Sequence, residues 1–307
     1  ETIKAANGLP IHLTHIQFQS YGNNGDRGFS SAAVEISNYL NKIPNLTCDV
    51  GQIMFGQTVT MSGDSMTQHK NYKHAHPHKW MCMDIECEAG CGVVPFKYKD
   101  KSFVNALQWA IGLEIFLLAE DPWKVFLTTD HPNGGPFTSY PHLIKLLMDR
   151  SFRNDILNQL PKDIMEHTIL HTLNREYTLN EIAIMTRSAP AKILGLTKKG
   201  NFSNGSDADI TIYDKRIKDP EEMFAHPSIV IKDGTVVVEN GKIKKYIWGK
   251  TQTVSPEYDK SIEKNLGKFF EKYHTMKLDN YIISDDEMER LVGSPVHINE
   301  CKHKRKE

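Results

Sequence analysis

The sequence predicts an α/β fold built on parallel strands, and three features of the chain indicate it. Strand-like, helical and again strand-like patterns follow one another over residues 11–18, 29–40 and 46–55, which is the repeating unit of a parallel sheet. A further apolar run, residues 125–129, stops at Asp130, before a loop rich in proline and glycine. After residue 196, glycines separate short strand-like runs, and this predicts a small β-structure of different character.

The first elements follow from periodicity. Residues 11–18 alternate apolar with polar side chains, which predicts a strand. Gly22–Gly28 is a glycine-rich loop, and the helix after it has Ser30 or Ser31 as its predicted cap. Residues 57–78 are polar and predict an excursion from the fold, after which residues 80–94 are strand-like again.

The remaining elements are predicted in the same way. Residues 103–118 form an amphipathic-to-buried helix that ends at Asp121-Pro122, and helical patterns dominate residues 142–194. The predicted later elements are strands 210–213, 228–232, 236–239 and 243–246, helices 258–274 and 285–291, and a basic tail at 302–306. We therefore divide the chain into residues 1–195, 196–250 and 251–307.

Composition excludes several classes of partner. The 307 residues contain 37 Lys and Arg against 38 Asp and Glu, a balance that gives no reason to expect nucleic acid. No run of about eighteen apolar residues occurs, so no membrane span is expected. The odd cysteine count of 5 predicts a reducing, cytoplasmic setting. Cys82, Cys87 and Cys91 lie close together, but their spacing lacks the C-x2-C pattern of a metal cluster.

Two side chains that end predicted parallel strands are candidates for chemistry. His15 and Asp130 offer an imidazole and a carboxylate, two ligand types that zinc accepts. On one barrel rim they could share a metal that activates water, and a carboxylate beside that water can move its proton. Each residue also has a simpler interpretation: a hydrogen-bonded structural histidine, and an aspartate that begins a turn.

Other polar residues are weaker candidates. Alternation along the strand directs His12 away from the side of His15, so we interpret it as structural. His131 could line the site, and Asn133 and Gly134 belong to a loop that either approaches a substrate or forms a tight turn. Glu86 belongs to an alternating acidic series with Asp84 and Glu88. This series could form the wall of a pocket or the solvent-exposed face of a hairpin. His74, His76 and His78 are interpreted as a solvated loop.

Several long motifs in order resemble one family. They are Leu-Thr-His-Ile-Gln-Phe-Gln-Ser-Tyr-Gly (13–22), Gly-Cys-Gly-Val-Val-Pro-Phe-Lys-Tyr (90–98), Asn-Ala-Leu-Gln-Trp-Ala-Ile-Gly (105–112), residues 121–140, and Ala-Pro-Ala-Lys-Ile-Leu-Gly-Leu followed by Gly-Ser-Asp-Ala-Asp-Ile (189–210). From about residue 11 to about 248 the chain resembles the large subunit of formylmethanofuran dehydrogenase, which is a metal-dependent amidohydrolase. A related formyltransferase/hydrolase complex has a similar large subunit.

The resemblance implies a fold, a metal and a reaction. It implies a TIM-like (β/α)8 barrel, of which residues 1–195 would hold about strands six to eight, with residues 196–250 as a composite β-domain. A binuclear zinc site would condense formate with methanofuran or run the reverse hydrolysis, beside tungsten- or molybdenum-containing and iron–sulfur subunits. By this resemblance His15 and Asp130 are metal ligands, and Asp130 is also the catalytic residue.

The chain departs from the family in its missing ligands. The His-x-His pair, the carboxylated lysine and a further histidine of the family have no counterpart before Ile11. We therefore expect a carboxyl-terminal half that is inactive alone and needs the amino-terminal half of the enzyme. Two alternatives remain, a different amide hydrolase of the superfamily and a non-catalytic scaffold protein.

Overall fold

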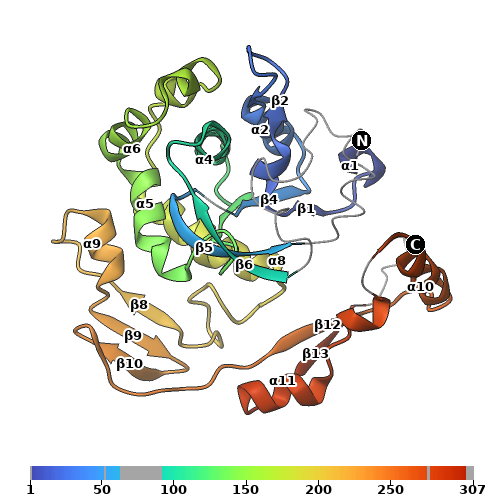
Figure 1. Cartoon of the computed structure of the whole chain (residues 1–307). Coiled ribbons are helices and arrows are strands. Elements are labelled where there is room, and N and C mark those ends of the chain that lie inside the picture. Colours follow the sequence, from blue (N-terminus) through green and yellow to red (C-terminus); the bar gives the residue numbers. More distant parts are fainter. Residues whose placement is uncertain (1, 52, 63–91, 275–276, 302–307) are drawn as a thin grey trace.

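The computed structural model describes residues 2–51, 53–62, 92–274 and 277–301 of the chain. Its centre is a parallel sheet of β1 (Ile11–Leu13), β4 (Leu46–Val50) and β7 (Val125–Leu127), with β4 in the middle (Figure 1). The mixed α/β class predicted from the sequence is thus confirmed. Within the described ranges this parallel sheet is open and has three strands.

The register of this sheet sorts its side chains into two faces. Leu46, Cys48 and Val50 of β4 alternate with Thr47 and Asp49. The apolar face of the sheet, which joins the buried core, comprises Leu46, Cys48, Val50, Val125 and Leu127. The opposite face, called here the polar face, carries His12, Thr47, Asp49 and Phe126, with the Phe126 ring stacked on the His12 ring. One strand therefore serves both the core and a polar surface.

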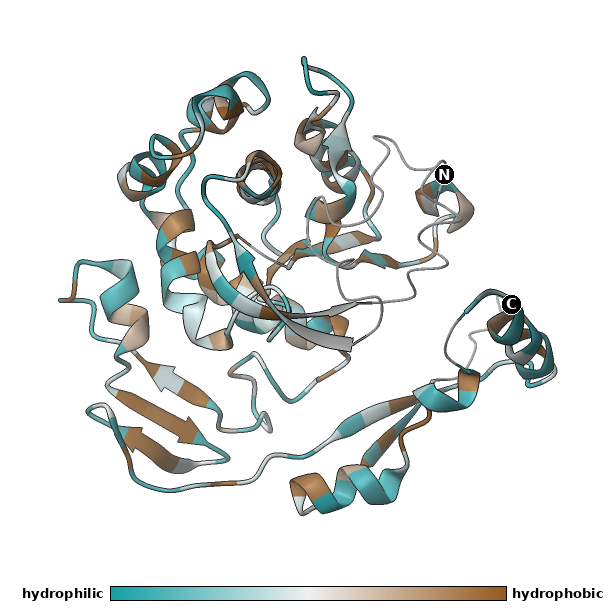
Figure 2. Cartoon of the chain, in the orientation of Figure 1, coloured by the Kyte–Doolittle hydropathy of each residue, from teal (hydrophilic) through white to brown (hydrophobic). Residues whose placement is uncertain are grey.

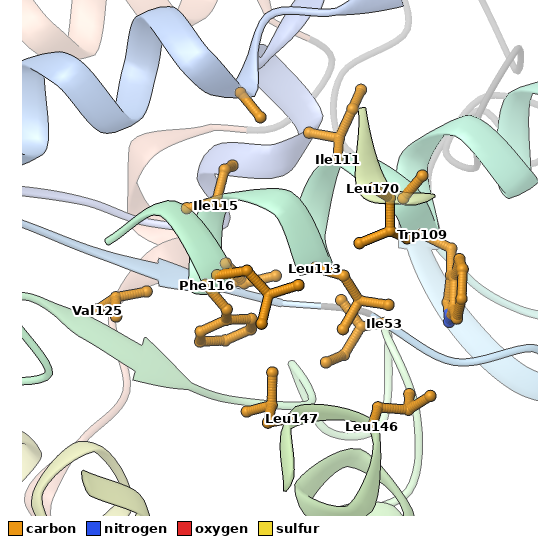
Figure 3. Close-up of a cluster of buried hydrophobic side chains, with 14 of the residues drawn as sticks. Ile53, Trp109, Ile111, Leu113, Ile115, Phe116, Val125, Leu146, Leu147 and Leu170 are labelled. Atoms are coloured by element: carbon orange, nitrogen blue, oxygen red, sulfur yellow. The ribbon is translucent and has the colours of Figure 1, made fainter. Parts of the chain in front are cut away.

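Helix α4 (Phe103–Leu118) fills the core beneath the apolar face, and its bounds are those predicted. It begins at Ser102, whose hydroxyl accepts from the Asn105 N–H, and is buried from Asn105 to Leu117. Figure 3 shows Leu113, Phe116 and Ile115 of this helix among side chains from the sheet and from the segments around it. A helix that is apolar on all sides must be covered on all sides. Helix α2 (Ala33–Lys42) covers one side of α4.

Three predicted elements differ from the structure near the sheet. The strand from Ile11 ends at Leu13 and a 3-10 turn, η1 (Ile16–Gln19), follows. Ser30 and Ser31 lie in the short strand β3, paired with β2 (Tyr21–Gly22), so α2 begins later than predicted and Ala32 is its N-cap residue. The hydroxyl of Ser31, one of the two predicted caps, still accepts from the Ala33 N–H at 3.1 Å. Residues 57–62 belong to β5 (Gly56–Ser62), which pairs with β6 (Gly92–Tyr98), rather than to a polar excursion. Partners distant in sequence decide such pairings.

Helices follow β7, as predicted. In order they are η3 (Phe137–Ser139), α5 (Tyr140–Met148), α6 (Arg150–Leu157), η4 (Lys162–Glu166), η5 (Leu170–Thr172), α7 (Leu179–Ala183), the π-helical turn η6 (Ile184–Ser188) and α8 (Ala189–Ile193). The short helix α1 (Thr2–Ala5) precedes the sheet. The turn η6 contacts β7, so the helical segment packs against this edge strand of the sheet.

An antiparallel sheet follows, in the order β11-β10-β9-β8. Its strands β8 (Ile210–Ile212), β9 (Ile229–Lys232) and β10 (Thr235–Glu239) match three of the predicted strands. The fourth, β11 (Lys242–Ile243), is shorter and lies earlier than the predicted strand 243–246, with which it shares only Ile243. Figure 2 shows that β9 and β10 are largely hydrophobic. Helix α9 (Pro220–Ala225) joins this sheet to the body by packing on α5.

The last segment extends away from the rest (Figure 1). It contains the predicted helices, α10 (Ile262–Tyr273) and α11 (Asp285–Val292), the 3-10 turn η7 (Leu278–Tyr281), and a parallel pair that the sequence did not predict, β12 (Gln252–Pro256) with β13 (His297–Cys301). No residue of α10 or α11 is buried. Among the described residues, no helix has the length and apolar character needed to cross a membrane.

Candidate functional site

His15 lies just past the carboxyl end of β1 and in an uncommon backbone conformation. Its φ and ψ are both 48°, in the left-handed region, which costs about 1–2 kcal/mol for a residue with a Cβ. The strand itself ends at Leu13, and His15 immediately precedes the 3-10 turn η1. Such outliers persist only where neighbouring contacts enforce them, so the contacts of His15 are of particular interest.

Asp130 occupies the corresponding place after β7 and is also left-handed, with φ 47°. Its Oδ2 lies 3.6 Å from Nδ1 of His15, and both side chains are about one-quarter exposed. The structure therefore brings together the two residues that sequence reasoning selected, although their strands are separated by β4. An imidazole nitrogen and a carboxylate oxygen that face each other can share a proton or a metal ion.

Asp49, on the polar face of β4, is the site residue that sequence reasoning missed. Its Oδ1 accepts from the backbone N–H of His15 at 2.9 Å and lies 3.4 Å from Nε2 of that ring. Its Oδ2 lies 2.8 Å from Nε2 of His12. A signal was present in the sequence: alternation along Leu46–Val50 places this carboxylate opposite the apolar side chains of a buried strand.

His12 corrects a second expectation. It was predicted to point away from the side of His15, yet both rings contact the same carboxylate of Asp49. The alternation argument failed because the strand ends at Leu13 and the chain turns before His15. His12 Nδ1 also lies 2.9 Å from the Thr47 hydroxyl, so both of its ring nitrogens have partners.

Gly51 provides space for the His15 ring. A Cβ at position 51 would lie 2.6 Å from Cδ2 and 2.7 Å from Cγ of that ring, closer than any ordinary contact. The Gly51 N–H donates to the Gln17 side chain at 3.1 Å, which ties the end of β4 to η1. Asp49 and Gly51 together define where the ring of His15 can lie.

The loop after Asp130 is held by internal bonds. The Gly134 N–H donates to the Asp130 carbonyl at 3.0 Å, and the Asn133 amide donates to Asp130 Oδ2 at 3.1 Å. His131 is exposed, and its Nδ1 accepts from the Phe137 N–H at 3.2 Å. These bonds hold residues 130–137 as a compact loop, and the substrate-binding role that the sequence suggests for His131, Asn133 and Gly134 stays a prediction.

A hairpin and a tyrosine support the same rim. Thr58 of β5 donates to the carbonyl of Asn133 at 3.1 Å and also contacts that of Pro132. Tyr140 donates to the Leu127 carbonyl at 3.4 Å. Burial raises the pKa of Tyr140, the charge of Asp49 adds to this shift, and Arg187 opposes it. Tyr140 also lines a pocket of about 230 Å³ with Arg187 and Tyr213.

Some predicted candidates lie outside the described residues. They are Glu86, Asp84, Glu88, the histidines His74, His76 and His78, and the cysteines Cys82, Cys87 and Cys91. Among the residues with described positions, no group of three or more His, Cys, Asp or Glu side chains is arranged to hold a metal ion. His15 and Asp130 thus offer two donors of a suitable kind and would need further ligands.

Most of the chain resembles one known protein family. Residues 4–238 match the amidohydrolase family, which is most of the chain. This chain belongs to the amidohydrolase family. The match covers both the parallel sheet with His15 and Asp130 and most of the antiparallel sheet.

Individual relatives narrow the comparison. The chain is 43% identical over 289 residues to FhcA of the formyltransferase/hydrolase complex Fhc from Methylorubrum extorquens, covering 92% of this chain and 52% of the relative. It is 40% identical over 284 residues to the protein FwdA of Methanocaldococcus jannaschii, covering 89% of this chain and 50% of that protein. The chain spans about half the length of the curated relatives it matches.

A solved structure extends the likeness to the fold. The crystal structure of the FhcABCD complex from Methylorubrum extorquens with methylofuran contains a chain that is 42% identical and superposes with a TM-score of 0.76. The alignment covers 98% of this chain and 55% of that chain. The likeness therefore includes the extended segment after residue 250 as well as the site.

Proposed function

We propose that this chain is part of a zinc-dependent amidohydrolase that transfers or hydrolyses a formyl group on an amine carrier of the methanofuran type. The observation that carries the proposal is the pair His15 and Asp130, which end two parallel strands with Nδ1 and Oδ2 3.6 Å apart. Support for the substrate comes from relatives of this type at 40–43% identity. Formate and the amine would be one side of the reaction, and the formamide and water the other.

The donor set fits zinc in kind. Zinc in proteins is bound by imidazole nitrogen and carboxylate oxygen, and His15 and Asp130 offer one of each. When bound, the metal supplies a Lewis acid that polarises the formyl carbonyl and acidifies water. The remaining ligands would come from parts of the complete enzyme other than the described residues.

Asp130 has the position of a proton carrier. Its carboxylate accepts a hydrogen bond from the Asn133 amide at 3.1 Å, which fixes its orientation toward His15. In hydrolysis, Asp130 takes a proton from the attacking water and returns it to the amine nitrogen as the C–N bond breaks. In condensation, the same carboxylate accepts the proton of the attacking amine and returns it to the departing water. The residue thus serves both directions of the reaction.

We further propose that the parallel sheet is part of a TIM-like barrel, with about strands six to eight as β1, β4 and β7. The strand order β1-β4-β7 agrees with such a segment, because the helices α2 and α4, which connect successive strands, pack on the apolar face of the sheet. The coverage of about half of each relative agrees with a carboxyl-terminal part of such an enzyme. Partners would then include the missing amino-terminal half, together with the other subunits of a complex, including those that carry tungsten or molybdenum and iron–sulfur clusters.

Metal analysis of the isolated chain and of the complete enzyme tests this proposal. The isolated chain should hold less than stoichiometric zinc and show no turnover, because it supplies too few ligands. The complete enzyme should hold zinc and hydrolyse the formylated carrier, and His15→Ala should remove both properties. Full zinc occupancy with activity in the isolated chain would contradict the proposal.

Two alternatives give different results in the same experiment. A different amide hydrolase of the family would lose zinc in the His15→Ala variant but would act on another amide in the wild type. A scaffold protein would show neither zinc-dependent turnover nor an effect of the substitution.

A further inference from the structure

We propose that Asp49 is a positioning residue that fixes the ring of His15 so that Nδ1 faces the proposed metal position beside Asp130. This inference rests on the proposed function, because it concerns how one ligand of that site is held. The Asp49 side chain lies on the middle strand, between the strands that carry His15 and Asp130. Asp49 can therefore orient His15, while Asp130 remains the carboxylate that is proposed to bind the metal.

The contacts of Asp49 constrain both the backbone and the ring of His15. Oδ1 accepts from the His15 N–H at 2.9 Å, which stabilises the left-handed backbone of that residue. The same oxygen lies 3.4 Å from Nε2. The ring is thereby oriented with Nε2 toward Asp49 and Nδ1 toward Asp130 Oδ2, which lies 3.6 Å away.

The second oxygen of Asp49 is held in place from the other side. Oδ2 lies 2.8 Å from Nε2 of His12, whose Nδ1 meets the Thr47 hydroxyl at 2.9 Å. The His12 ring is in addition stacked on Phe126, with centroids 5.4 Å apart. The hydrogen bonds that link Thr47, His12 and Asp49 thus limit rotation of the Asp49 carboxylate, and the Asp49 side chain is only 11% exposed.

Gly51 completes the positioning of the ring. It lies two residues after Asp49, just past the end of β4, and its missing Cβ leaves the space that Cγ and Cδ2 of His15 occupy. The carboxylate and the glycine therefore fix the ring by two different means, one by attraction and one by shape. Partners that orient a metal-bound histidine in this way commonly change metal affinity by about 10–100-fold when they are removed.

The test measures zinc affinity of the complete protein that contains this chain, by competition with a chelator. We expect Asp49→Asn and Gly51→Ala each to weaken zinc binding by about 10–100-fold, with partial recovery in Asp49→Glu. The cobalt-loaded variants should show altered d–d absorption bands, because the ligand nitrogen of His15 has moved. Asp121→Asn is the matched control: it makes the same chemical change at a carboxylate whose Oδ1 accepts from the Trp123 N–H, and its zinc affinity and cobalt spectrum should stay close to those of the wild type.

The outcomes separate this inference from the proposed function. If His15→Ala and Asp130→Asn lose zinc while Asp49→Asn and Gly51→Ala bind it with unchanged affinity and spectrum, the role of Asp49 is wrong and the metal site stands. If His15→Ala and Asp130→Asn keep full zinc, the metal site itself is wrong. Should Asp49→Asn fail to fold, Gly51→Ala decides, since its backbone conformation is open to alanine.

Discussion

The two faces of the parallel sheet carry opposite kinds of side chain on the same three strands. The apolar face joins Leu46, Cys48 and Val50 to the buried core around α4. The polar face joins Thr47, Asp49 and His12 through hydrogen bonds. Burial stabilises the first face, whereas the second depends on each polar group having a partner. Stability and chemistry can therefore be changed separately in this sheet.

A carboxylate on each side of the sheet sharpens this contrast. Asp49 contacts two histidine rings at the polar face. Glu114 of α4 is fully buried in the core, where the hydroxyls of Ser31 and Thr168 donate to it and the Ile169 N–H donates at 2.5 Å. Burial raises the pKa of Glu114 against the opposing effect of these bonds. The same functional group thus orients a ring in one place and joins chain segments in the other.

The largest expected effect is on activity at the rim of the polar face. In the complete protein, Asp130→Asn should lower the rate of formyl transfer or hydrolysis by about 10²–10⁴-fold, because the proton carrier is lost. Thermal unfolding should change little, since the side chain is 28% exposed. Asp121→Asn is the control and should keep the wild-type rate. An unchanged rate in Asp130→Asn would favour a scaffold.

The next effect concerns the stability of the apolar side. Leu113→Ala in α4 should lower the free energy of unfolding by about 2–5 kcal/mol, because it leaves a cavity in a closed core. Denaturant titration measures the loss. The matched control, Leu266→Ala in the exposed helix α10, should change stability by no more than about 0.5 kcal/mol. Equal losses in both variants would show that α10 is covered by something else.

A third prediction concerns the pH dependence of stability. The folded protein holds the pKa of Glu114 above its ordinary value of 4.5, through burial. The contribution of a raised carboxyl pKa is fully present below the unfolded pKa and is lost as the pH rises through the folded pKa. We expect the unfolding free energy to fall over this interval in the wild type, and Glu114→Gln to lack that component. Parallel pH profiles of the two proteins would contradict the assignment.

The smallest expected effect is at the loop that supports Asp130. Thr58→Val removes the hydroxyl that donates to the Asn133 carbonyl and should cost about 0.5–1.5 kcal/mol of stability. Thr211→Val makes the same substitution in another strand, β8, and controls for the effect of the change on strand propensity. Proteolysis within residues 130–137 should be faster in Thr58→Val than in the control if the hydroxyl holds this loop.

Much of the fold could be predicted because local patterns were strong. The bounds of α4 follow from an apolar run that begins at Phe103 and ends before Asp121-Pro122. The strands of the antiparallel sheet follow from short apolar runs between glycines. The pairing of β5 with β6 and of β12 with β13 was not predictable in this way, because each strand depends on a partner far along the chain. The division at residues 195 and 250 stays a prediction.

The sequence alone determined the class of fold, the helix α4 and the candidates His15 and Asp130, since these depend on local periodicity and on residue types with known chemistry. Only the tertiary structure decided which side chains meet: Asp49 beside both histidines, Gly51 beneath the ring of His15, and Glu114 among hydroxyls from two other segments. The reason is physical. His15 has a left-handed backbone after a short strand, so the alternation of side-chain directions along a strand does not predict where its ring points. Contacts between distant segments form only when the core brings their backbones together.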